Sequence, residues 1–316
     1  TAHAANSNLL RVSNHGYDSA LADSRIRIGD GTIADPTLKV AMLHLDPARP
    51  RNSRTHGIDE MNPKLGEIFS AWKGQLIEGE MGPAILLDLS PRLTNEQRLE
   101  VESIVEDFWP GIGKTWAWTS RGRGRIDRLS LWLGQLSSKQ NQNRFVRIPP
   151  ELKNKPVVVQ GGNLPISAHR RPPRKGEHVS ILDAALVESG LATEFLNQTL
   201  PEQEITWSLA TGRRPQIHHP SSFSFEDKNQ SLLVQATGRI VKLVHCELTE
   251  ETIPRLVDAA IEYGFGKLTL RVSLDPELQP RLQGSIDRQL TARGGSHTGF
   301  VAQQPGDSML LLCLTS

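Results

Sequence analysis

The first part of the chain alternates short apolar runs with a longer amphipathic stretch. The runs at 38–45 and 83–89 are bounded by polar or turn residues, as buried strands are. Between them, from 63 to 78, apolar side chains recur at intervals of three and four residues, which predicts a helix. Thr94 and Gln97 form a capping-box signature that opens a second helix, which we expect to end near Pro110. Strand, helix, strand, helix predicts a largely parallel α/β core.

Two further segments, 114–119 and 128–134, are expected to be strands joined by the sequence SRGRGRID. In the second segment the leucines fall on one face, and Arg128 and Trp132 fall on the other. The leucine face suits a core. Trp132 is therefore expected beside Arg128 on the side that is open to solvent or to a ligand.

The composition changes to loop chemistry from 135 to 175, where we expect one strand at 157–160, and a helix follows near 180–197. The last third alternates apolar and amphipathic stretches again and ends in a hairpin. We predict three parts: an N-terminal α/β lobe with a basic β-hairpin (1–164), a basic linker with one helix (165–220) and a C-terminal α/β sandwich lobe (221–316).

Length and composition agree with this division. A chain of 316 residues exceeds what one core usually organises, so two lobes are expected. With 37% apolar and 22% charged residues the chain is of globular type. The predicted fold class is α/β, with α+β as the alternative. Two cysteines without CxxC spacing and no leader-like or membrane-length apolar run favour a cytoplasmic protein.

The net charge of +1 conceals a strong segregation of charge. Residues 112–175 contain 14 Lys and Arg against two acidic residues, whereas the remaining 252 residues contain 22 basic and 33 acidic residues. A separated field of this kind attracts a partner of opposite charge, such as nucleic acid.

The candidate site is the Arg/Trp-rich segment around SRGRGR. Arginine offers a planar fork to phosphate, glycine lets a backbone approach closely, and tryptophan supplies a surface on which bases stack. These ingredients predict binding of RNA or single-stranded DNA; no helix-turn-helix, zinc finger or basic zipper is visible for duplex readout. The predicted contacts are Arg121, Arg123, Arg125, Arg128, Trp118, Trp132, Arg144, Arg147, Arg170, Arg171, Arg174 and Lys175.

Two segments resemble catalytic loops but lack residues that those loops require. The stretch PGIGKT lacks the upstream glycine and strand of a P-loop, and GGSHTG lacks the second glycine of a nucleophile elbow. The segment GRRPQIHH adds Arg213 and Arg214, for which we expect either a stiffened ligand clamp or a linker that neutralises acids elsewhere.

Three alternatives remain. The protein could be an assembly subunit whose basic segment meets an acidic protein face. A metal-dependent nucleic-acid enzyme could use Asp46 and Asp88 at strand ends. The order of elements, with Asp88 at a strand end, then a helix, then SRGRGRIDRLSLWLG, resembles the palm of archaeal-type primases. Ser90 stands where that family has its second carboxylate.

The third alternative is a small-molecule enzyme. The order of elements after 221 resembles the later half of an acetyltransferase fold, which would imply an acyl cofactor. The glycine-rich pantetheine loop of that family is absent before the helix expected at 249–264, so its pyrophosphate would lack a nest of amides. We assign no catalytic residue, no metal ligand and no cofactor.

Overall fold

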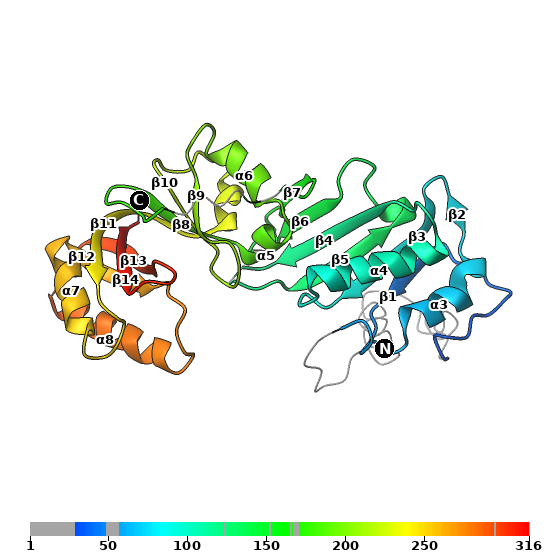
Figure 1. Ribbon diagram of the computed structural model, residues 1–316, viewed down its shortest axis with the longest axis horizontal. Coiled ribbons are helices and arrows are strands. Elements are labelled where there is room, and N and C mark those ends of the chain that lie inside the picture. Colours follow the sequence, from blue (N-terminus) through cyan, green and yellow to red (C-terminus); the bar gives the residue numbers. More distant parts are fainter. Residues whose placement is uncertain are drawn as a thin grey trace.

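Two mixed β-sheets with flanking helices lie along one elongated molecule (Figure 1). The computed structural model describes residues 29–48, 57–122, 124–151, 153–164, 166, 171–293 and 295–315. Each sheet has seven strands, and the chain passes from the first to the second near residue 178. No helix in this described part is long and apolar enough to cross a membrane.

The first sheet is mixed, whereas the strand–helix alternation predicted a largely parallel one. Its order is β1(Met42–Leu45), β3(Gly82–Leu89), β5(Arg128–Leu133), β4(Lys114–Ser120), β6(Asn143–Arg147) and β7(Val157–Gly161), with β2(Glu78–Gly79) beside β3. The pairs β1–β3 and β4–β6 are parallel, but β5 is antiparallel to both of its neighbours. The connection from β4 to β5 is too short for a crossover, so the hairpin must insert an antiparallel strand.

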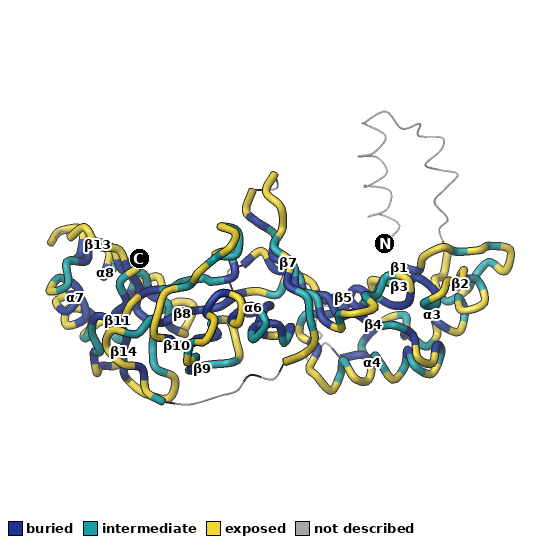
Figure 2. The backbone as a smooth tube through the Cα atoms, turned by 90° about the horizontal axis from the view of Figure 1, so that it is seen from above, coloured by how far each residue is buried: buried dark blue, intermediate teal, exposed yellow. Residues whose placement is uncertain are grey.

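Two helices cover one face of the first sheet (Figure 2). They are α3(Leu65–Trp72), followed by the 3₁₀ turn η1(Lys73–Gln75), and α4(Asn95–Phe108). Thr94 caps α4 as expected, because its hydroxyl accepts from Gln97 N while the Gln97 side chain accepts from Thr94 N. The leucines of β5 are buried in the same core as these helices, and Arg128 and Trp132 lie on the opposite face, as the alternation predicted.

The middle of the chain contains more structure than the expected linker with one helix. It forms β8(His178–Leu182), α5(Ala184–Glu188), α6(Ala192–Thr199), β9(Thr206–Leu209) and β10(Gln216–His219). These strands are short and partly polar, so they carry no apolar run that would announce them. Leu182, Phe195 and Leu233 belong to the core of the first sheet, while β8 pairs within the second. The division into 1–164, 165–220 and 221–316 stays a prediction.

The second sheet has the order β12(Phe265–Leu270), β13(His297–Gln303), β14(Met309–Leu314), β11(Val234–His245), β8, β10 and β9. The 3₁₀ turn η3(Lys228–Leu233) precedes β11. A further 3₁₀ turn, η2(Gly134–Leu136), follows β5 of the first sheet. Helices α7(Ile253–Glu262) and α8(Leu278–Arg293) pack on it around a second apolar cluster. The expected terminal hairpin is present as β13–β14.

Candidate nucleic-acid interface

The basic hairpin loop, residues 121–127 between β4 and β5, is an ordered turn where it is described. Arg121 N donates to Asp127 Oδ2 at 2.5 Å, and Asp127 N donates to Thr119 O at 2.9 Å. Gly122 has φ of +88°, a conformation that suits glycine. These contacts fix the turn and leave the side chains of Arg121 and Arg125 exposed. Arg123 lies outside the described residues.

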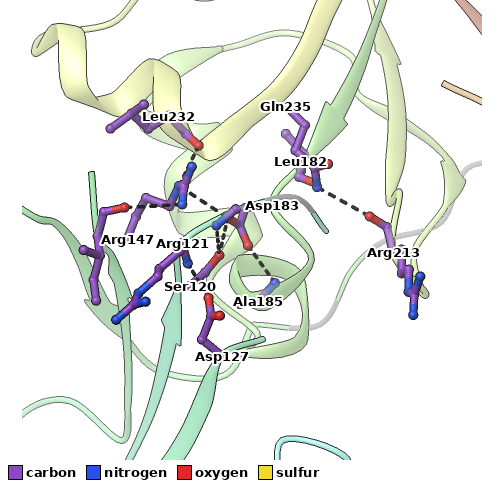
Figure 3. A network of polar contacts seen from close by, with 12 residues as sticks. Ser120, Arg121, Asp127, Arg147, Leu182, Asp183, Ala185, Arg213, Leu232 and Gln235 are labelled. Atoms are coloured by element: carbon purple, nitrogen blue, oxygen red, sulfur yellow. Dashed lines mark hydrogen bonds and ion pairs between the residues drawn. The ribbon is translucent and has the colours of Figure 1, made fainter. Parts of the chain in front are cut away.

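Arg147 is part of a buried polar network that joins the first sheet to the middle segment (Figure 3). Its Nε donates to Leu232 O at 3.1 Å and lies 3.6 Å from Asp183 Oδ2, which also accepts from Ser120 Oγ at 2.7 Å. Burial raises the pKa of Asp183 and lowers that of Arg147. With a side chain 9% exposed, Arg147 holds the fold together and is not available to a ligand.

The face of the first sheet opposite α3 and α4 brings together the predicted pair Arg128 and Trp132. Arg128 Nη1 donates to Asp88 Oδ2 at 2.7 Å, and its side chain is 60% exposed. The guanidinium of Arg144 lies 5.4 Å from the centroid of the Trp132 ring. The Arg144 guanidinium therefore lies within cation–π distance of the Trp132 ring, and the charge of the neighbouring Arg128 is partly neutralised by Asp88.

Trp118 lies on the other face, in the core. It is 3% exposed, its ring lies 6.2 Å from that of Trp116, and Arg98 covers it at 5.6 Å. Base stacking on Trp118 would require the core to open. Trp118 pairs with Leu129 across the hairpin, and Leu129 belongs to the core face of β5. This pairing is the signal from which the burial of Trp118 could have been predicted.

The segment 171–175 contributes less free charge than its sequence suggests. Arg171 forms a two-pronged ion pair with Glu177, at 2.6 and 3.0 Å, and lies 3.5 Å from Glu204. The hydrogen bond with Glu177 raises the pKa of Arg171. Lys175 Nζ donates to the Tyr263 hydroxyl at 3.2 Å. Arg174 is exposed, and Arg170 lies outside the described residues.

The loop between β9 and β10 contacts the basic hairpin loop. A Cβ at Gly124 would lie 2.5 Å from Arg213 O, so the two backbones are in contact where Gly124 has φ of +66°. A cavity of about 630 Å³ lined by Arg125 and Arg213 runs along this contact. The sequence showed Arg213 as part of a basic segment, but only the fold places it beside the hairpin.

The two carboxylates considered for metal chemistry differ in their surroundings. Asp46 is exposed after β1. Asp88 is buried, where it accepts from Arg128 and Ser130 and lies 2.9 Å from His44 Nε2. Within the described residues, no group of three or more His, Cys, Asp and Glu is arranged to hold a metal ion.

Comparison with known proteins bears on the fold. No protein-family model matches the sequence, and no curated protein matches it. The crystal structure of a putative methyltransferase from Porphyromonas gingivalis W83 is similar, with a TM-score of 0.51 at 13% identity. The likeness covers 87% of this chain and 59% of that one, so this chain spans less than two thirds of that protein. It confirms the predicted α/β fold class.

A second structure is more distant. TrmN from Thermus thermophilus matches over 44% of each chain, at 13% identity and with a TM-score of 0.28. A likeness at that level carries no argument about this chain.

Proposed function

We propose that this protein binds RNA or single-stranded DNA through the basic hairpin loop and its neighbours. The observation that carries the proposal is the exposure of Arg121 and Arg125 on an ordered loop that meets Arg213 along a cavity. The proposed contacts are Arg121, Arg125, Arg128, Trp132, Arg144, Arg174 and Arg213, together with Arg123 and Arg170.

The charge of the loop supports this proposal. Among the described residues, neither Arg121 nor Arg125 lies within ion-pair distance of a carboxylate. Their guanidinium groups are therefore free to donate in pairs to phosphate oxygens, which is how arginine holds a nucleic-acid backbone. Arg128 and Trp132, on the adjoining sheet face, extend the surface with a cation and a ring.

The placement of these side chains favours single strands. They project from loops and from the face of a sheet, and none of the described ones lies on a helix that could enter a major groove. Flexible single strands can follow an irregular basic surface and stack unpaired bases on a ring.

Fluorescence anisotropy with labelled single-stranded RNA, single-stranded DNA and duplex DNA across a salt series tests the proposal. Each phosphate contact contributes a slope of about −0.7 in log K against log salt for a single strand. The double variant Arg121→Gln/Arg125→Gln should bind at least about tenfold more weakly, with a slope shallower by about 1.4. The matched control is Arg281→Gln/Arg288→Gln, which removes two exposed arginines of α8.

Equal losses in the two double variants would mean that only the overall charge matters and would contradict the proposed interface. No binding at low salt would remove the proposal altogether and favour the assembly-subunit alternative, which a measurement of size at two concentrations then tests.

A methyl-transferring enzyme that acts on nucleic acid is the second candidate. The similar structure is described as that of a putative methyltransferase. In this chain β1 and β3 are parallel and end at the same edge, where Asp46 is exposed. Open α/β sheets bind ligands at such an edge. The test measures transfer of a labelled methyl group from S-adenosylmethionine to RNA. Transfer that is lost in Asp46→Asn and retained in the exposed control Asp59→Asn would favour this candidate. If no transfer is detected, nucleic-acid binding without catalysis remains as the proposed function.

A further inference from the structure

Three arginines from two distant parts of the chain line one cavity. Arg213 and Arg214 come from the loop between β9 and β10, and Arg271 directly follows β12. The cavity has a volume of about 700 Å³, and Gln279 and Gln283 of α8 add polar groups to its wall. A smaller adjoining cavity of about 200 Å³ shares Arg214 and Arg271.

The backbones that carry these arginines are held in place. Gln235 Nε2 donates to Arg213 O at 3.4 Å, and the Arg213 side chain points away from that contact (Figure 3). Arg214 Nη2 donates to Gln279 Oε1 at 3.5 Å, and Arg271 N donates to Val301 O at 2.8 Å. Backbone hydrogen bonds therefore hold Arg213 and Arg271, a side-chain hydrogen bond holds Arg214, and all three residues line the cavity.

The positive charge of the cavity has no carboxylate to balance it. None of the three arginines lies within ion-pair distance of an acid in the described part of the chain. The acids of the neighbouring loop, Asp275 and Glu277, do not line the cavity, and Asp275 Oδ1 accepts from Glu277 N.

Two further observations mark this charge as uncompensated. Burial, and then the charges of Arg271 and Arg213, lower the pKa of Arg214. The Nε of Arg271 is buried and has no hydrogen-bond partner. Arginine keeps its proton in proteins, so a cluster of this kind is unfavourable until an anion enters it.

We propose that this cavity binds a phosphate group, with Arg213, Arg214 and Arg271 donating to its oxygens. Arginine forks match phosphate in pairs, and the volume is within the range of small-ligand pockets. A phosphorylated small molecule and the phosphorylated end of a nucleic acid share this chemistry. The site shares Arg213 with the proposed nucleic-acid interface, but Arg214 and Arg271 belong to the cavity alone, so its test does not depend on binding by the hairpin loop.

Isothermal titration calorimetry with inorganic pyrophosphate, on the full chain, tests the site. Arg214→Gln and Arg271→Gln should each weaken binding at least about tenfold, because each removes charge-assisted hydrogen bonds. The control Arg288→Gln removes an exposed arginine of α8, with the same change in net charge, and should bind within about twofold of the unmodified protein.

Thermal unfolding without ligand shows whether the variants fold. Removing one of three like charges relieves repulsion, so Arg214→Gln and Arg271→Gln should unfold no earlier than Arg288→Gln. Pyrophosphate should raise the unfolding midpoint of the unmodified protein and not that of Arg271→Gln.

Absence of pyrophosphate binding at low salt, or equal weakening in Arg288→Gln, would overturn the proposal. Retained pyrophosphate binding in Arg121→Gln/Arg125→Gln would show that the site is separate from the hairpin loop. An oligonucleotide with a 5′-phosphate that binds more tightly than its 5′-hydroxyl counterpart, by a margin lost in Arg271→Gln, identifies a nucleic-acid end. Equal binding of the two oligonucleotides, with pyrophosphate binding retained, identifies a small phosphorylated ligand.

Discussion

Arg147, at the end of β6, and Asp183, at the N-cap of α5, form a buried ion pair. Replacing Arg147 with methionine leaves the Asp183 carboxylate buried beside Ser120 without its cation. Loss of one partner from a buried pair costs about 3 kcal/mol in the free energy of unfolding. Urea denaturation should show this loss for Arg147→Met and a change below about 0.5 kcal/mol for the exposed Arg121→Met. Similar midpoints for the two variants would contradict a structural role for Arg147.

His219 predicts an acid-dependent loss of stability. Its Nδ1 donates to Ser221 O at 2.5 Å, and its Nε2 lies 2.8 Å from Ser180 Oγ. Burial, chiefly, lowers the pKa of His219 from 6.5 to about 4. The unfolded chain therefore takes up a proton below about pH 6.5 that the folded chain takes up only near pH 4, and the free energy of unfolding falls between these values, by at most roughly 3 kcal/mol.

Comparison with His219→Gln isolates this contribution. Denaturation curves between pH 7 and pH 4 should show a shallower pH dependence in His219→Gln and an unchanged one in the exposed control His245→Gln. Asp183 acts in the opposite direction, because its raised pKa makes the folded chain take up a proton first as the pH falls. A pH dependence that His219→Gln leaves intact would assign the effect to other groups.

Charge along the sequence overstates the charge that the fold leaves free. Arg147 and Arg171 lie in the basic window 112–175, but their partners Asp183 and Glu177 lie just outside it. No count along the chain reveals these pairs, because the fold brings the residues together. Conversely, Arg271 is not part of a basic segment of the sequence, and only the fold places it in one cavity with Arg213 and Arg214.

At the scale of elements, the strongest periodic patterns were the ones that could be predicted. The helix opened by Thr94, the two strands of the basic hairpin and the terminal hairpin all form near their expected bounds. Strands β6 and β10 escaped prediction because they are short and rich in polar residues, and their burial depends on neighbouring strands. The antiparallel insertion of β5 follows from the short loop, which outweighs the strand–helix alternation before it.

Gly124 couples the basic hairpin loop to the loop between β9 and β10. A methyl group at this position would collide with the Arg213 carbonyl at 2.5 Å and push the two loops apart. Gly124→Ala should therefore weaken oligonucleotide binding in the anisotropy assay by at least about threefold, since misplaced contacts lose their geometry. Gly111→Ala is the matched control, because Gly111 also has positive φ, at +71°, and has nothing within 4 Å of the added Cβ. Equal loss in both variants would mean that backbone strain alone is responsible.

At the scale of the whole molecule, the two larger of three apolar clusters in the described part of the chain are joined through the second sheet, whose strands β8, β11, β13 and β14 carry the third. The first core runs from Leu43 to Leu233, and the second gathers around α7 and α8. Strand β11 links them, because its first half pairs with β8 and its second half with β14. The arginine-lined cavity lies where the two parts meet, since Arg213 precedes β10 and Arg271 follows β12.

Separate cores predict that thermal or chemical unfolding is not a single transition. Leu131 and Leu256 are fully buried, one in each core. Leu→Ala at such positions costs about 2–5 kcal/mol. If each core unfolds as its own unit, differential scanning calorimetry of Leu131→Ala should show one shifted transition, and that of Leu256→Ala should show the other. One shared transition that moves in both variants would mean that β11 and β8 bind the two cores into a single cooperative unit, and the predicted division of the chain into lobes would then be wrong.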